Sequence, residues 1–579
     1  MRPMVRIAWA LVLATAGLAQ VRTDGPSTGQ VPVNNAAVSG VVKEAGTGQP
    51  LAGYVVETTA YVRQADGALS RKDVFDTTDD RGYYRLGDLP PGYYRILSRA
   101  KTEYAEALGA NRSRRVRLAG SDLENIDFTI ARLGTISGRV LDENREPVSG
   151  VRVYLVQRQY FKGALRYLFK FALSDDRGHY VLDKAEAGRP YLLMVDGNED
   201  FLPGQSDAPL SPKLRRPVAL RTWYPNSPQP EEAMPVVLRS GERREGVDIV
   251  VGKAPSYCLE GALVAPTGPG ESRFYIEQLL SNDLPGAARV GLLPGGVTGA
   301  DGRFRICKLT PGTYRLSAWK LEQQNRQNQQ FLFAPDDPQL YGVAMVTIAD
   351  RDIRDYRLAL TAAQSLEGEV VWDGPAPAGS ASRKLTIALT PTRAGFQGKS
   401  QHPLATADIP GSFSLSDVVG ESYYVQPSLS GAGVLGGLYV KDVTYSGKSV
   451  LHESLDVGHA TPGAGLRIVV ANDGGKIGVR VTDKNGNPVS GAQIVIIPGD
   501  IPSAAIMADA MAFGQTYENG TYTAGPLPPG KYWVMASSET FEPTPESMAR
   551  LLSFRNRFTE VLLSANGTAQ VTLQPIALE

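Results

Sequence analysis

Four short phrases between residues 478 and 532 decide the fold: GVRV (478–481), PVSGAQI (488–494), NGTY (519–522) and PPGKY (528–532). Apolar and polar residues alternate around them, which is the period-two pattern of a strand with one buried face. Asn519-Gly520 between such runs predicts a hairpin, because glycine tolerates the positive φ of a tight turn. Pro529-Gly530 suits a type II turn, in which proline sets φ at the second position and glycine supplies a positive φ at the third. The stretch therefore predicts an antiparallel β-sandwich.

The same phrases recur in the same order along the rest of the chain. The first phrase opens at Gly40, Gly138, Gly261, Gly368 and Gly478. Since a seven-strand sandwich takes about 100 residues, we expect an all-β fold of five tandem antiparallel Ig-like or transthyretin-like β-sandwiches. We place them at residues 37–132, 133–253, 254–363, 364–473 and 474–579, and name them units 1 to 5. The linkers between them are short, so we expect an elongated or bent chain rather than one globule.

The glycines of the hairpin phrase are expected to be structural turn residues with a positive φ. Four of them follow Asp or Asn directly or after one further residue: Gly82, Gly178, Gly302 and Gly520. Two other segments depart from the strand pattern. Residues 158–172 are expected to be a long hairpin arm of unit 2. Residues 543–554 carry a helical stripe and predict a short helix over one end of unit 5.

The order of the phrases resembles that of the carboxypeptidase regulatory-like domain. Unit 1 carries it as DRGYYRL (80–86) followed by LPPGYY (89–94), and units 2 and 5 carry it comparably well. The resemblance implies a transthyretin-like, prealbumin-type sandwich, related to the B-type repeats of bacterial collagen adhesins. It also implies an exported location. The resemblance is to an accessory sandwich and not to a zinc peptidase domain, for which the chain leaves no room.

The composition excludes several classes of protein. The 579 residues include 60 Lys+Arg and 60 Asp+Glu, so the formal net charge is zero. A phosphate-binding protein usually shows a basic excess, so nucleic acid is not an expected partner. With 42% hydrophobic and 21% charged residues the chain is globular rather than disordered.

Residues 1–19 have the pattern of a signal peptide. Arg2 and Arg6 form a positive segment before an apolar run that begins at Ile7, and small residues follow at Ala16, Gly17 and Ala19. The run is too short for a hydrocarbon core of about 30 Å. We therefore expect a cleaved signal peptide, with an uncleaved anchor helix as the alternative. Residues 20–36 are expected to be a flexible lead-in. The mature chain is expected to have no transmembrane segment and to be periplasmic, on the outer surface or secreted.

Catalytic and metal-binding residues are not expected. The four histidines have no chelating spacing, and we predict no enzyme activity, no cofactor and no metal. Pairs such as Asp79-Asp80 and Asp175-Asp176 could bind calcium, but aspartate before glycine is already explained by turn chemistry. The histidines are His179, His402, His452 and His459.

Aromatic residues outside the strand pattern are the candidates for glycan binding. Trp223 and Tyr224 lie in a proline-rich connection, and Trp372 ends a strand beside Asp373-Gly374. Exposed aromatic rings can stack on the apolar faces of sugars. The alternative is that Trp223 and Tyr224 plug the end of their own sandwich.

The two cysteines, Cys258 and Cys307, both fall in unit 3. In an oxidising compartment they are expected to form a disulfide. The bond requires that their strand ends lie at the same end of the sandwich, because Cα atoms more than about 7 Å apart cannot be bridged without backbone movement. The alternative is two separate buried thiols.

The sequence thus predicts a non-catalytic, exported scaffold or adhesive protein of the cell envelope, with an unknown protein or polysaccharide as its ligand. The alternative is a carbohydrate-binding protein that acts on extracellular or periplasmic polysaccharide.

Overall fold

The structure is a computed structural model. It describes residues 35–63, 69–99, 113–196, 203–204, 217–279, 289–290, 295–320, 340–377, 383–392, 403–420, 422–430, 437–457, 465–499, 501, 503–539 and 541–577. The expected signal peptide at 1–19 and nearly all of the lead-in at 20–36 lie outside these residues. So do His402 and His459.

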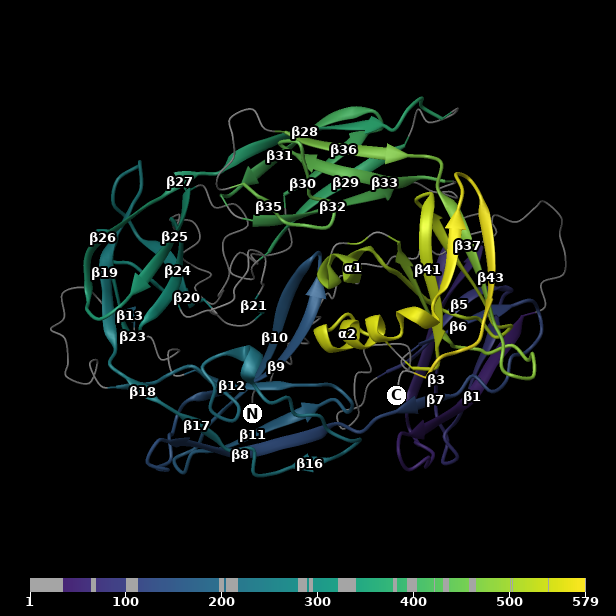
Figure 1. The fold of residues 1–579 in the computed structure, drawn as a ribbon, viewed down its shortest axis with the longest axis horizontal. Helices are drawn as coiled ribbons and strands as arrows, with labels where there is room; N and C mark the ends of the chain where they lie inside the picture. The colour runs from purple at the N-terminus through teal and green to yellow at the C-terminus, as the bar shows by residue number, and fades with distance from the viewer. Residues whose placement is uncertain are drawn as a thin grey trace.

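The regular secondary structure of the described residues is almost entirely β-strand, and the expected all-β fold class is confirmed (Figure 1). Unit 1 contains two sheets, of strand order β4-β1-β7 and β3-β2-β5-β6. Its strands are β1 (Ala36–Glu44), β2 (Val55–Arg63), β3 (Leu69–Thr77), β4 (Tyr83–Leu89), β5 (Gly92–Ser98), β6 (Ser113–Leu118) and β7 (Phe128–Ile130).

Unit 2 has the sheets β11-β8-β16, to which β17 adds, and β15-β12-β9-β10-β21. The last strand of the second sheet, β21 (Arg289–Val290), comes from unit 3. The strands of unit 2 are β8 (Gly134–Asp142), β9 (Arg152–Phe161), β10 (Ala164–Leu173), β11 (His179–Ala185), β12 (Leu192–Asp196), β13 (Pro203–Gly204), β14 (Val218–Ala219), β15 (Thr222–Trp223), β16 (Arg243–Arg244), β17 (Ile249–Val251) and β18 (Lys253–Ala254).

Unit 3 has the sheets β13-β23-β19-β26 and β22-β20-β24-β25-β27, so β13 of unit 2 extends a sheet of unit 3. Units 2 and 3 therefore each contribute an edge strand to the other. The strands of unit 3 are β19 (Tyr257–Val264), β20 (Ser272–Gln278), β22 (Gly295–Val297), β23 (Arg303–Leu309), β24 (Gly312–Lys320), β25 (Leu340–Ile348), β26 (Ile353–Ala359) and β27 (Thr361–Ala362).

Unit 4 has the sheets β31-β28-β36-β33-β34 and β30-β29-β32-β35. Its strands are β28 (Gln364–Trp372), β29 (Lys384–Pro391), β30 (Leu404–Asp408), β31 (Gly411–Val418), β32 (Ser422–Ser430), β33 (Tyr439–Tyr445), β34 (Lys448–Ser449), β35 (Leu455–Asp456) and β36 (Leu466–Ala471).

Unit 5 has the sheets β40-β37-β43 and β39-β38-β41-β42, and it carries both described α-helices. The expected helix is α2 (Pro545–Ser553), which Thr544 caps. The helix α1 (Ala504–Ala510) was not expected, because its seven residues are too few for a recognisable helical stripe. The strands are β37 (Gly475–Val481), β38 (Gln493–Pro498), β39 (Ala512–Gln515), β40 (Thr521–Leu527), β41 (Gly530–Ser537), β42 (Thr559–Leu563) and β43 (Thr568–Leu573).

One pairing recurs in every unit. The opening strand pairs antiparallel with the strand after the hairpin glycine and parallel with the closing strand, as β37 does with β40 and β43. The corresponding parallel pairs are β1–β7, β8–β17, β19–β26 and β28–β36. Apolar and polar residues alternate in the same way in parallel and antiparallel strands, so the sequence does not reveal the direction of a pair. This parallel pair was therefore not expected. The assignment of the sheets to five units stays our proposal.

The Pro-Gly-x-Tyr phrase requires tyrosine for a reason that alternation alone does not show. In units 1 and 5 the hydroxyls of Tyr94 and Tyr532 each donate a 2.6 Å hydrogen bond to a carbonyl four residues earlier, of Pro90 and Pro528. The rings are buried in the sandwich cores. Each tyrosine therefore joins the preceding turn to its core, a contact that phenylalanine cannot make.

The hairpin glycines have φ angles of 71°, 74°, 77° and 73° at Gly82, Gly178, Gly302 and Gly520. Each also passes close to the opening strand of its unit. The carbonyl oxygen of Gly520 accepts a 2.8 Å hydrogen bond from the amide of Val481. A Cβ atom at position 520 would lie 2.6 Å from the Val481 carbonyl oxygen.

Gly520→Val should therefore lower the free energy of unfolding of unit 5 by more than about 1 kcal/mol, through strain at positive φ and through the clash. Hydrogen exchange of β37 and β40 in the full chain measures this loss. Gly486→Val is the matched control, because Gly486 has φ 85° but open space around its Cβ position. An equal cost at both positions would show that the close approach contributes nothing.

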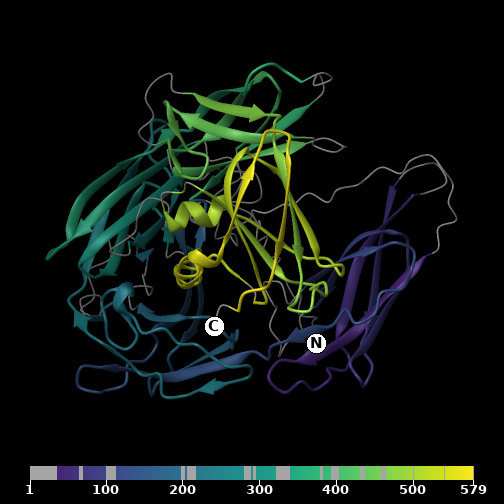
Figure 2. The same cartoon turned by 45° about the vertical axis from the view of Figure 1, so that its right-hand side comes forward.

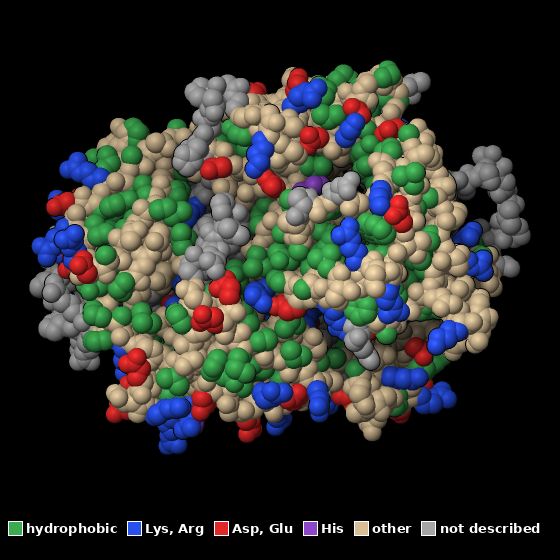
Figure 3. All heavy atoms as spheres, viewed as in Figure 1, with side chains coloured by type: hydrophobic (Ala, Val, Ile, Leu, Met, Phe, Trp, Pro, Cys, Tyr) green, Lys and Arg blue, Asp and Glu red, His purple; other side chains and the backbone are tan. Residues whose placement is uncertain are grey.

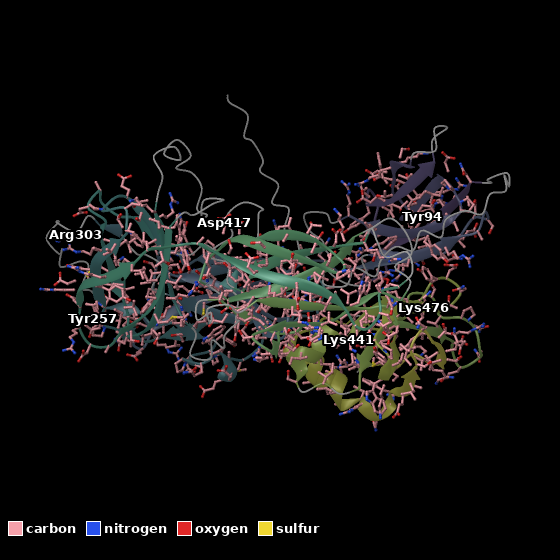
Figure 4. All side chains as sticks on the ribbon, turned by 90° about the horizontal axis from the view of Figure 1, so that it is seen from above. Tyr94, Tyr257, Arg303, Asp417, Lys441 and Lys476 are labelled. Atoms are coloured by element: carbon pink, nitrogen blue, oxygen red, sulfur yellow. A yellow bond between two sulfur atoms is a disulfide. The ribbon has the colours of Figure 1, made fainter. Side chains whose placement is uncertain are left out.

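The five units are arranged around a centre, so that the last unit lies beside the first (Figures 1 and 2). The chain is therefore bent and not elongated. Unit 5 returns to unit 1, where the rings of Tyr93 and Tyr517 lie 5.5 Å apart and the Arg117 amide donates to Glu518. Seen from above in Figure 4, Tyr94 of unit 1 and Tyr257 of unit 3 lie toward opposite ends of the molecule, with unit 4 between them.

Candidate functional site

The most distinctive feature of the molecule is a hairpin arm, residues 152–173, formed by β9 and β10 of unit 2. The two strands pair over their full length around a turn at Lys162-Gly163, where both φ angles are positive. The neighbouring strand β12 covers only residues 152–156 of β9. The end of the arm therefore extends beyond its own sandwich, and Figure 1 shows it crossing the middle of the molecule toward α1. The expected long hairpin is present.

The tip of the arm packs on the outer face of unit 5. The amide of Tyr160 donates a 2.7 Å hydrogen bond to the carbonyl of Pro543, just before α2. The Tyr160 side chain packs against a cluster that fills the space between the β38–β41 sheet and the two helices. Flexible methionine side chains suit such an irregular gap. The buried residues of this cluster are Val495, Ile497, Met507, Ala508, Met511, Met535, Met548, Leu551, Phe558 and Ile576.

Charged contacts join the arm tip to units 4 and 5 at one point. Asp509 of α1, whose side chain is only 2% exposed, accepts from Nδ1 of His452 in unit 4 at 2.6 Å. The ammonium of Lys162 on the arm lies 3.4 Å from the same carboxylate. Arg158 of the arm also pairs with Glu546 of α2. Three units therefore meet around the arm.

A second charged cluster joins unit 2 to unit 5 beside the arm. Arg189 pairs with Glu186 at 2.6 Å and also with Glu542 of unit 5. Two carboxylates thus share one guanidinium in a poorly exposed interface. Burial raises the pKa of Glu542 to about 7; Arg189 opposes this shift and Glu186 adds to it. The Tyr191 hydroxyl also lies in this cluster, where it accepts a 3.0 Å hydrogen bond from the amide of Glu186.

The contact between units 2 and 5 should therefore weaken as the pH rises through about 7. The carboxyl of Glu542 has an ordinary pKa of 4.5 when it is exposed to solvent. Between pH 4.5 and about pH 7, the closed arrangement, in which units 2 and 5 are in contact, therefore binds more protons than the open arrangement, in which they are apart. Its stability relative to the open arrangement rises as the pH falls across this window, by at most about 1.4 kcal/mol per pH unit. Hydrogen exchange of the 541–544 segment, measured from pH 5 to pH 8, reports the opening.

Glu542→Gln should remove this pH dependence and keep the segment protected at pH 8. Glu539→Gln is the matched control, because the carboxylate of Glu539 pairs with Arg550 of α2 at 3.6 Å. A Glu542→Gln variant with an unchanged pH profile would contradict the assignment.

The structure corrects the interpretation of Trp223 as a glycan platform. Trp223 is 0% exposed and belongs to a second buried cluster of unit 2, on the outer face of the β15-β12-β9-β10 sheet. Its neighbours there include Tyr154, Val156 and Met194. A ring without exposed surface cannot stack on a sugar, so this interpretation is wrong. Trp223 plugs its own unit, but on the outside of a sheet rather than at the end of the sandwich core.

The other two candidates for glycan binding are partly buried. Tyr224 packs against the core of unit 2, and Trp372 packs against the core of unit 4. The three candidates are not brought together, since Trp372 lies in a different unit. The indole nitrogens of Trp223 and Trp372 are both buried without a hydrogen-bond partner.

Cys258 and Cys307 are bonded in the structure, with 2.02 Å between the sulfur atoms and 4.0 Å between the Cα atoms. They lie on the adjacent strands β19 and β23, at an irregularity in the register beside the pair Leu259–Ile306. The opening strand and the strand after the hairpin glycine are neighbours in every unit. The topology therefore brings the two cysteines together.

The aspartates considered as calcium ligands serve the hairpin turns. The Asp79 carboxylate accepts from the amides of Arg81 and Tyr83, and Asp175 accepts from those of Arg177 and His179. The backbone amides hold the pKa of Asp79 below its usual value. His179 is the first residue of β11, directly after the turn, and its Nδ1 lies 3.8 Å from Oδ2 of Asp175.

Sequence reasoning missed the residues that dock the arm. Asp509 and Glu546 are separated by 347 and 388 residues from Lys162 and Arg158, the arm residues that they contact, and no local pattern links them. A weak signal was present in the sequence of the arm. Its apolar residues follow neither the period of a strand nor that of a helix, and it is rich in Arg, Lys and aromatic residues, which is unusual for an exposed hairpin.

Comparison with protein families matches the end of the chain. The model of the carboxypeptidase regulatory-like domain matches residues 476–574. Unit 5 is therefore similar to the carboxypeptidase regulatory-like domain over nearly its whole length. The match runs from β37 to β43, so this domain includes α1 and α2, against which the arm packs.

Solved structures similar to the chain include bacterial pilins. The minor pilin GBS52 of Streptococcus agalactiae is 14% identical with a TM-score of 0.22, over 38% of this chain and 97% of the pilin. The major pilin subunit BcpA of Bacillus cereus is 11% identical with a TM-score of 0.15, over 57% of this chain and 99% of the pilin. The Bacillus anthracis TIE protein is 10% identical with a TM-score of 0.14, over 95% of this chain and 75% of that protein.

A search of curated proteins found no match. Among the helices of the described residues, none has the length and hydropathy needed to cross a membrane.

Proposed function

We propose that the chain is a non-catalytic, exported scaffold or adhesive protein of the cell envelope, in which the arm holds the sandwiches in a fixed arrangement. The observation that carries the proposal is the docking of one hairpin of unit 2 on both units 4 and 5. Tandem domains with small interfaces normally reorient about their linkers. Here the arm supplies a backbone hydrogen bond, ion pairs and an apolar contact between units that are distant in the sequence.

A fixed frame of sandwiches presents its sheet faces at constant spacing, which suits a protein that binds several partners or one large one. Figure 3 shows Lys, Arg, Asp and Glu side chains interspersed over the visible face, without one dominant sign. A mixed surface of this kind favours specific protein contacts over general attraction to a polyanion. The carboxypeptidase regulatory-like domain of unit 5 supports an accessory rather than a catalytic role, and this support is by analogy of fold.

Export is part of the proposal and rests on the N-terminal pattern and on the cysteine pair. A disulfide persists in the periplasm or outside the cell and is rare in a reducing cytoplasm. We propose the periplasm, the outer surface or secretion as the location.

Cross-linking mass spectrometry on intact cells tests the scaffold proposal. The native protein should yield cross-links between the arm and unit 5 together with cross-links to other envelope proteins. Arg158→Glu places a like charge against Glu546 and should reduce both sets. Arg139→Glu is the control, because Arg139 pairs with Asp248 within unit 2. A cytoplasmic location, or envelope cross-links unaffected by Arg158→Glu, would contradict the proposal.

The alternative function, polysaccharide binding, has lost its main candidate residue, since Trp223 is buried. The partly buried Tyr224 and Trp372 lie in different units and do not form a shared platform. No observation in the described residues favours that function over a scaffold.

A further inference from the structure

Arg166 lies on β10 near the tip of the arm, at the junction with unit 4. The carbon of its guanidinium is 3.7 Å from the ring centroid of Phe161 on the arm and 5.0 Å from that of Tyr424 on β32. The two rings are themselves 5.7 Å apart in an edge-on arrangement. The cation is thus held between aromatic side chains of two units.

Two nitrogens of this guanidinium, Nε and Nη2, are buried and have no hydrogen-bond partner. Burial lowers the pKa of Arg166, and the Tyr424 hydroxyl partly opposes that effect, but an arginine does not lose its proton in a protein. A buried charge whose N–H groups are unpaired is costly. The site is therefore incomplete as it stands.

Arg221 shows how the same chain satisfies an arginine at the junction of two units. Its Nε and Nη2 both donate to Asp196 Oδ2, at 3.0 and 2.8 Å, and it also donates to the carbonyls of Gln278 and Leu279 in unit 3. The edge that Arg221 uses for a carboxylate is the edge that Arg166 leaves unpaired. The nearby carboxylate of Asp509 is already engaged by His452 and Lys162.

We propose that the Nε–Nη2 edge of Arg166 binds a carboxylate group of a ligand, held between the arm and β32 of unit 4. The two N–H groups of this edge are parallel and match the two oxygens of one carboxylate. Among the described residues at the arm tip, the positive charge of Lys162 balances the negative charge of Asp509. The positive charge of Arg166 remains, so a ligand with one negative charge would neutralise the site. Phe161 and Tyr424 provide apolar walls for the carbon atoms that carry the carboxylate.

The ligand chemistry is a carboxylate, which an acidic sugar or a peptide could supply. Neither Nε nor Nη2 has exposed surface, so the arm and β32 must separate before the carboxylate enters. Binding should then be slower than a diffusion-limited encounter, and the bound state should hold the arm more tightly. This inference is independent of the scaffold proposal, because it concerns one residue and its ligand.

Thermal unfolding of the full mature chain tests the proposal. The reference buffer contains chloride, which is replaced at constant ionic strength by sodium acetate, galacturonate or N-acetylglycine. All three carboxylates should raise the Tm of the native chain. The more effective of galacturonate and N-acetylglycine identifies the source. Arg166→Gln should abolish the rise, and Arg166→Lys, which keeps the charge but not the paired edge, should weaken apparent affinity at least about tenfold. Arg177→Gln, at an exposed arginine of the same unit, should leave it unchanged.

A second measurement keeps the test decisive if Arg166→Gln folds poorly. In the chain labelled with 15N-arginine, the Nε–H resonance of Arg166, assigned by its loss in Arg166→Lys, should shift on addition of acetate and not of chloride. An equal Tm rise in the native chain and Arg166→Gln, or an Nε–H resonance that does not respond to acetate, would overturn the proposal.

Discussion

Trp223→Ala should destabilise unit 2 by about 3–5 kcal/mol, the usual cost of truncating a fully buried tryptophan. The indole is 0% exposed and fills a cluster with Tyr154, Val156, Leu192 and Met194 on the outer face of the sheet. The same sheet carries the arm. The loss of packing on this sheet in Trp223→Ala should therefore also loosen the contacts of the arm with units 4 and 5.

Hydrogen exchange of β9 and β12 in the full chain, together with urea unfolding, measures this loss. Val181→Ala is the matched control in the same unit, because Val181 is 58% exposed and should change stability by less than about 0.5 kcal/mol. A Trp223→Ala chain that stays fully protected but loses binding to a polysaccharide would restore the glycan interpretation.

Removal of the disulfide by Cys258→Ala with Cys307→Ala should destabilise unit 3 by about 4 kcal/mol in the loop-entropy account. The bond closes a loop with a sequence separation of 49, so its loss frees a large part of the unfolded unit. Both cysteines are 2% exposed, and alanine introduces no buried polar group. Urea unfolding of unit 3, followed by exchange of β19 and β23, gives the difference.

The native chain should show the same loss after reduction, and the double variant should not respond to reductant. Mass spectrometry of the unreduced, exported protein provides the direct test. Two free thiols after folding in air would contradict the bond, and so would a double variant as stable as the native chain.

Much of each unit could be predicted because its signals are local. Alternation of apolar residues identifies a strand with a buried face, and Asn519-Gly520 or Pro529-Gly530 identifies the turn at its end. These signals depend on the φ and ψ angles of a few consecutive residues, so they appear in the sequence wherever the geometry occurs. The disulfide was predictable for a different reason: only two cysteines exist, and both fall in one unit.

The candidate sites were less predictable because burial depends on distant segments. Trp223 lies in a proline-rich connection that looks exposed, and only the fold shows that this connection covers the outer face of a sheet. In the same way, the parallel pairing of opening and closing strands follows from how the chain crosses between sheets, which alternation does not encode.

The sequence by itself determined the all-β class, the hairpin turns, the arm and the short helix α2, because neighbouring residues specify each of them. The tertiary structure alone decided that the chain bends until unit 5 meets units 1 and 2, and that the arm of unit 2 docks on units 4 and 5. These contacts join residues such as Lys162 and Asp509, whose separation in the chain leaves no periodic or local trace. Their energies come from burial, shape and charge at surfaces that exist only after each sandwich has folded.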